Sequence, residues 1–88
     1  MTKDLNMNKW WMYIIECRDG KLYTGITNDL RRRLRQHNHG QGCRFTKYRR
    51  PVKLIFKEQH SSKESALKRE SEVKGFSRKK KLALIDSG

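Results

Sequence analysis

"MYIIECRDGKLYTGITNDLRRRLRQH", residues 12–37, contains a turn and a helix start on which the predicted fold depends. Residues 10–17 and 21–26 are rich in aromatic and β-branched side chains, and each segment is too short for a typical helix. Arg18-Asp19-Gly20 lies between them, and Asp followed by Gly favours a tight turn. The stretch therefore predicts two antiparallel strands joined as a hairpin.

The length of the hairpin loop determines whether Tyr13 and Tyr23 lie on the same face. A two-residue loop at Asp19-Gly20 would place the two tyrosines on opposite faces, because side chains alternate along a strand. A three-residue loop at Arg18–Gly20 would place Tyr13 opposite Gly25 and both tyrosines on one face. Asp followed by Gly suits a type I turn closed by a left-handed glycine, so we predict the three-residue loop.

A helix is predicted to follow the second strand. It begins within the capping-competent residues 27–29, and Leu30 and Leu34 mark its apolar face. At about 100° per residue, Arg33 and His37 lie within roughly 60° of Leu30, whereas the neighbouring arginines lie on the far side. We therefore expect Arg33 and His37 to point toward the sheet.

The rest of the chain predicts a basic loop, a third strand and two more helices. Residues 39–51 contain two glycines and several basic residues, and 52–58 are apolar enough for a strand. The two helices are expected over 61–74 and 78–85. The predicted fold class is α+β: a small three-stranded antiparallel sheet flanked by about three helices. We expect a single domain over 10–88 after a flexible N-terminal tail, residues 1–9.

The helix expected after residue 60 carries an acidic residue on its apolar face. Ser61 is predicted to cap its N-terminus. Ala66, Leu67 and Val73 form the inward stripe, and Glu70 falls within that stripe. Because an inward carboxylate is costly unless it is paired or metal-bound, Glu70 is a candidate site residue.

Charge and cysteine usage limit the classes of function. The chain has 88 residues, with 22 Lys and Arg against 9 Asp and Glu, and a net charge of +13. This excess favours a polyanion, with nucleic acid as the first candidate and an anionic membrane surface as the second. No apolar run approaches the roughly 20 residues that span a bilayer, so we expect a soluble, cytoplasmic protein. Cys17 and Cys43 lack the spacing of a zinc site, and Cys17 is expected to pack as a small hydrophobe.

The order and spacing of these residues resemble those of the GIY-YIG nuclease superfamily. Its two signature triplets correspond to Trp11-Met12-Tyr13 and Tyr23-Thr24-Gly25. Arg33 matches the arginine of the following helix, His37 matches a histidine frequent in the family, and Glu70 matches the metal-binding glutamate. The first triplet departs from the pattern, because Trp and Met replace its glycine and aliphatic residue. The resemblance is greatest to the small single-domain bacterial group of GIY-YIG proteins.

This resemblance implies an endonuclease that hydrolyses phosphodiester bonds in DNA, in DNA repair or recombination, with one Mg²⁺ or Mn²⁺ ion. Glu70 would hold the metal, and Arg33 would hold the phosphate. Tyr13 is the candidate general base, directly or relayed through a neighbour, provided that Arg33 and the metal lower its pKa from about 10. Tyr23 would orient water or phosphate, and His37 competes with Tyr13 for the role of base.

Other interpretations of the same residues stay open at this point. The alternative function is a catalytically silent DNA- or RNA-binding module of the same fold. Glu70 would then form a salt bridge with Arg33, and the two tyrosines would be core-edge aromatics. We expect a monomer or weak homodimer, with specificity supplied by a partner protein. The cations expected to contact phosphates of the nucleic acid are Arg31, Arg32, Lys47, Arg49, Arg50, Lys74, Arg78 and Lys79.

Overall fold

The computed structural model describes residues 9–87 and confirms the α+β class. Its three strands form an antiparallel sheet in the order β2-β1-β3. Apart from Lys9, the predicted N-terminal tail lies outside the described residues. None of the helices in the described part has the length and apolar character needed to cross a membrane. The elements are β1 (Trp10–Cys17), β2 (Leu22–Thr27), α2 (Leu30–Asn38), α3 (Arg44–Lys47), β3 (Val52–His60), α4 (Lys63–Lys74) and α5 (Arg78–Ser87).

The hairpin between β1 and β2 has the predicted register. Tyr13 pairs with Gly25, and Ile15 pairs with Tyr23. The turn closes through the Gly20 N–H, which donates to the Cys17 carbonyl over 2.9 Å, and Gly20 has a φ of +85°. The three-residue loop is therefore confirmed, and it places both tyrosines on one face of the sheet.

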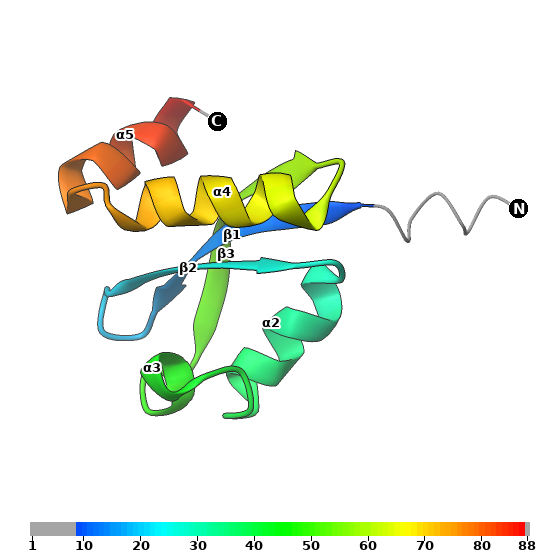
Figure 1. Cartoon of the computed structure of the whole chain (residues 1–88). Coiled ribbons are helices and arrows are strands. Elements are labelled where there is room, and N and C mark those ends of the chain that lie inside the picture. The colour runs from blue at the N-terminus through cyan, green and yellow to red at the C-terminus, as the bar shows by residue number, and fades with distance from the viewer. Residues whose placement is uncertain (1–8, 88) are drawn as a thin grey trace, which may run out of the picture.

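Helices cover both faces of the sheet (Figure 1). Tyr13, Ile15 and Cys17 face α2 and α3, whereas Met12 and Ile14 face α4 and α5. This alternation follows from the period of two along β1. The candidate residues of β1, β2 and α2 consequently share one face, and Glu70 comes from a helix on the other.

The structure corrects two details of the predicted helices. The N-cap of α4 is Ser62, whose Oγ accepts from the Ser65 N–H over 3.1 Å, so the prediction of Ser61 is wrong. Leu67 is 43% exposed and does not belong to the inward stripe. The buried stripe of α4 consists of Ala66 and Val73. Leu67 is exposed because it lies about 100° around the helix from that stripe.

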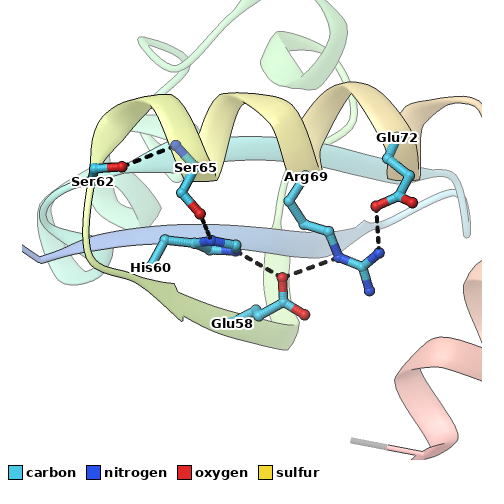
Figure 2. Close-up of polar contacts among 6 residues, drawn as sticks. All are labelled: Glu58, His60, Ser62, Ser65, Arg69 and Glu72. Atoms are coloured by element: carbon cyan, nitrogen blue, oxygen red, sulfur yellow. Dashed lines mark hydrogen bonds and ion pairs between the residues drawn. The ribbon is translucent and has the colours of Figure 1, made fainter.

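A polar network attaches α4 to the end of β3 (Figure 2). His60 bridges the two elements, with Nδ1 2.7 Å from Ser65 Oγ and Nε2 2.8 Å from Glu58 Oε1. Arg69 donates to the same Glu58 oxygen over 3.1 Å and to Glu72 over 2.7 Å. Most of these groups are partly buried, so the network fixes the position of α4, the helix that carries Glu70.

Candidate active site

Tyr13 and His37 form the buried centre of the candidate site. Tyr13 is 2% exposed and His37 is fully buried, and Tyr13 Oη lies 2.9 Å from His37 Nε2. The other ring nitrogen, Nδ1, lies 2.8 Å from Thr46 Oγ1. Thr46 can donate its hydroxyl proton to the Cys43 carbonyl, 3.4 Å away. With Nδ1 protonated, each hydrogen in this chain has an acceptor, and Nε2 is left to accept the Tyr13 proton.

Arg33 lies one helical turn before His37, and its side chain points toward the sheet as predicted. Its Nε donates to Tyr13 Oη over 3.4 Å. Two further bonds fix the guanidinium, from Nη1 to Gln36 Oε1 over 3.0 Å and from Nη2 to the Gly42 carbonyl over 2.9 Å. A positive charge is thus held beside the Tyr13 hydroxyl.

Tyr23 lies against the same histidine. Its ring meets the His37 ring edge-on, with centroids 5.5 Å apart, and stacks on Phe45 at 5.7 Å. The Lys74 ammonium lies 5.8 Å from the Tyr23 centroid. Tyr23 therefore lies near side chains from α2, α3 and α4.

Glu70 reaches this region from α4. Its side chain is 17% exposed, and Oε2 lies 3.3 Å from Lys74 Nζ. Its charge is close enough to Tyr13 to raise the pKa of that hydroxyl. The structure therefore pairs Glu70 with Lys74, not with Arg33, and Lys74 connects Glu70 to Tyr23.

Gly25 leaves room for the Tyr13 side chain. A Cβ atom at this position would lie 2.6 Å from Tyr13 Oη and 2.8 Å from Cζ, which are impossibly short contacts. The Tyr13 ring can thus lie over β2 only if residue 25 has no side chain. This is the physical reason for the glycine of the Tyr23-Thr24-Gly25 triplet.

Burial determines the protonation states of the three central rings. It raises the pKa of Tyr13, although the Arg33 charge and hydrogen bond oppose the shift, and it also raises the pKa of Tyr23. It lowers the pKa of His37 to about 4, with the Arg33 charge acting in the same direction. At pH 7 His37 is therefore neutral and Tyr13 is protonated. Arg33 by itself does not bring the pKa of Tyr13 below its usual value, because desolvation outweighs the cation, and the combined effect of Arg33 and a metal ion stays a prediction.

The carboxylate of Glu70 suits a metal ion whose remaining ligands are water and substrate. Within residues 9–87 no three side chains of His, Cys, Asp or Glu form a cluster that could hold a metal. Mg²⁺ often binds through only one or two carboxylates, together with water and substrate phosphates. A single partly buried glutamate whose ion pair within residues 9–87 is with the half-exposed Lys74 fits that mode of binding.

The predicted phosphate-contacting cations divide into one half-buried side chain, Arg49, and several exposed ones. Arg49 is half-buried; it donates to Asp19 over 3.1 Å and to the Phe45 carbonyl over 2.7 Å, and so ties the hairpin turn to α3. Its contact with nucleic acid stays a prediction. The other predicted contacts are exposed: Arg31, Arg32, Lys47, Arg50, Lys74, Arg78 and Lys79.

Thr46 and the second role of Lys74 were missed by the sequence reasoning. Thr46 lies within residues 39–51, which were expected to be a loop but contain the short helix α3. Four helical residues carry no periodicity that a sequence pattern can detect. Lys74 was expected only as a phosphate contact, and its spacing of four residues from Glu70 was the available signal.

Known proteins share both the sequence and the fold. Residues 9–83 match the family model of the GIY-YIG catalytic domain. A UPF0213 protein of Staphylococcus saprophyticus is 52% identical over 82 residues, which cover 93% of this chain and all of that protein. The solution structure of a UPF0213 protein from Bacillus halodurans is 42% identical with a TM-score of 0.58, covering 89% of this chain and 83% of that one. The solution structure of a protein from E. faecalis is 34% identical with a TM-score of 0.63, covering 90% and 84%. The chain therefore belongs to the GIY-YIG family, among its small UPF0213 members.

Proposed function

We propose that this protein is a metal-dependent endonuclease that hydrolyses phosphodiester bonds in DNA. The observation that carries the proposal is the Tyr13 hydroxyl, which lies between a neutral histidine and the Arg33 guanidinium on a strongly basic chain. Binding of DNA alone needs positive charge, but it does not need a buried proton acceptor beside a hydroxyl. We expect the activity to serve DNA repair or recombination.

Arg33 is suited to hold the scissile phosphate. A guanidinium has five N–H donors in a planar fork, and three of them serve Tyr13, Gln36 and Gly42. The remaining donors are available for phosphate oxygens, whose spacing matches the fork. Because the protein contacts already fix the side chain, phosphate binding costs little additional ordering.

Tyr13 and His37 are suited to move the proton of the attacking water. As the water oxygen bonds to phosphorus, Tyr13 Oη accepts its proton and passes the hydroxyl proton to His37 Nε2, 2.9 Å away. The 3′ oxygen leaves with the electron pair of the broken P–O bond. This relay avoids a free phenolate, which the raised pKa of Tyr13 disfavours at neutral pH. Thr46 keeps the imidazole in the required orientation.

Glu70 is the residue that would hold Mg²⁺ or Mn²⁺, and Lys74 must release its carboxylate when it does so. The bound ion would stabilise the negative charge that develops on the phosphoryl and leaving oxygens. Tyr23, close to both His37 and Lys74, would orient water or phosphate between them. We expect a monomer or weak homodimer that obtains target specificity from a partner protein.

Nicking of supercoiled DNA in Mg²⁺ or Mn²⁺ tests the proposal. Wild type and Glu64→Ala, an exposed acidic control on the same helix, are expected to nick the DNA. Glu70→Ala is expected to lose activity by on the order of a hundredfold while it still binds DNA. Salt-sensitive DNA binding without cleavage in either metal would identify a silent binding module. Equal cleavage by Glu70→Ala would point to a contaminating nuclease.

A further inference from the structure

Tyr48 is an exposed aromatic side chain on the basic surface. It follows α3 as its C-cap and is 76% exposed. The other large hydrophobic side chains exposed in the described part of the chain are aliphatic, namely Leu67 and Leu82, at 43% and 40%. A tyrosine ring that is largely in water offers a free π-face to a ligand.

The ring borders a shallow cationic groove of about 360 Å³. Lys47 Nζ lies 5.5 Å from the Tyr48 centroid, and Arg44 also lines the groove. The sequence contains no acidic residue between Asp29 and Glu58, so no nearby carboxylate in sequence offsets this charge. The groove therefore suits an anionic ligand that also carries a flat apolar face.

The same segment of chain forms the wall of the groove and the support of the candidate active site. Gly42, whose carbonyl accepts from Arg33 over 2.9 Å, comes between groove residues Gln41 and Cys43. The Cys43 carbonyl lies 3.4 Å from Thr46 Oγ1, which contacts His37. A strand in the groove would consequently lie next to Arg33, the residue proposed to hold the phosphate.

We propose that Tyr48 stacks on an unpaired base of a DNA strand whose phosphates contact Arg44 and Lys47. A base in a duplex has both faces covered by its neighbours, whereas an unpaired base has a face available for an aromatic ring. The preferred substrate is thus DNA with a single-stranded segment beside the cleavage point. The part concerning cleavage rests on the proposed nuclease function, but the stacking contact does not.

Binding without metal separates the stacking contact from catalysis. In EDTA, the probes are a single-stranded oligonucleotide that contains 2-aminopurine and a blunt duplex of the same sequence. Tyr48→Ala is expected to weaken single-strand binding by on the order of tenfold and to abolish the quenching of 2-aminopurine. Tyr48→Phe is expected to restore both, and Leu82→Ala serves as the control for loss of an exposed apolar group. Duplex affinity and the slope of affinity against salt should stay as in wild type, since no charge is removed.

Three results would overturn the inference. The first is an unchanged single-strand affinity in Tyr48→Ala, and the second is an equal loss of affinity for single strand and duplex in that variant. The third is a dimer of the wild-type protein that is lost in Tyr48→Ala, because a second copy of the chain would then occupy the groove. Cleavage assays on the same variants distinguish the nuclease function from the stacking contact. Single-strand binding that depends on Tyr48, without any cleavage in Mg²⁺ or Mn²⁺, supports the inference and contradicts the nuclease. If Tyr48→Ala cleaves DNA and binds single-stranded DNA normally, the result supports the nuclease function and contradicts the inference.

Discussion

Tyr13 and His37, which are 24 positions apart in the sequence, are joined by a buried hydrogen bond of 2.9 Å between Oη and Nε2. The bond links the first strand to the end of the first described helix, and neither side chain has appreciable contact with solvent. Burial keeps the imidazole neutral, so the nitrogen that faces Tyr13 is a proton acceptor. This pair is the part of the molecule on which the proposed chemistry depends.

Tyr13→Phe is expected to abolish DNA cleavage without weakening DNA binding. The variant keeps the ring but loses the hydroxyl that lies between His37 and Arg33. We expect the single-turnover nicking rate to fall by at least about a hundredfold, as for loss of a general base, and the Kd to stay within about twofold. A Kd that rises in parallel with the loss of rate would instead give Tyr13 a binding role.

The stability of the fold is expected to decrease as the pH is lowered, because His37 then becomes protonated. The unfolded side chain binds a proton near pH 6.5, whereas the native pKa is about 4, so the unfolded state holds more protons between these values. The contribution of His37 to the free energy of unfolding is complete above pH 6.5, and about 3 kcal/mol of it is lost by pH 4. Urea unfolding from pH 7 to 4 measures the loss, and a flatter curve for His37→Gln assigns it. Parallel curves for the two proteins would contradict the assignment.

Thr46→Val is expected to impair catalysis more than stability. The change keeps the shape of the side chain but removes the hydroxyl 2.8 Å from His37 Nδ1, so the tautomer of the imidazole is no longer fixed. We expect kcat to fall on the order of tenfold, while KM changes little. Thr46→Ser, which keeps the hydroxyl, is the matched control. Equal losses in Thr46→Val and Thr46→Ser would show that packing, not the hydroxyl, matters.

Gly25→Ala is expected to displace Tyr13. The new methyl group would lie 2.6 Å from Tyr13 Oη, so the ring must move or the strands must separate. We expect a loss of about 1 to 3 kcal/mol in the free energy of unfolding, together with loss of cleavage. In a double-mutant cycle with Tyr13→Ala, the cost of Gly25→Ala should largely disappear because the clash is gone. Additive costs would show that the strain lies elsewhere.

Lys74→Ala is expected to strengthen the binding of Mn²⁺ to the free protein. The lysine competes with the metal for Glu70, across an ion pair of 3.3 Å that is half-exposed on the lysine side. Removal of such a pair favours the metal by about two- to fivefold. Titration followed by electron paramagnetic resonance measures the free Mn²⁺. Lys79→Ala, which removes an exposed cation from α5, controls for net charge, and an equal gain in that variant would argue against direct competition.

Local chemistry made the hairpin and the first helix predictable. Only a few turn types are compatible with Asp19-Gly20. The turn type then determines which side chains of β1 and β2 share a face. Helical periodicity then placed Arg33 and His37 on the side of α2 that meets the sheet. These local patterns therefore predict that four of the candidate site residues, Tyr13, Tyr23, Arg33 and His37, lie together.

The three strands, the turn register, the orientation of α2 and the family resemblance can all be inferred from the amino-acid sequence, because each depends on residues that are close in the chain or fixed in spacing. Three relationships become visible only once the elements are packed: Lys74 pairs with Glu70, Thr46 orients His37, and Gly25 makes room for Tyr13. Partners and burial depend on which elements pack together, and no local period contains that information. The protonation states follow the same rule, since the cost of desolvating Tyr13 and His37 arises from segments far away in the chain.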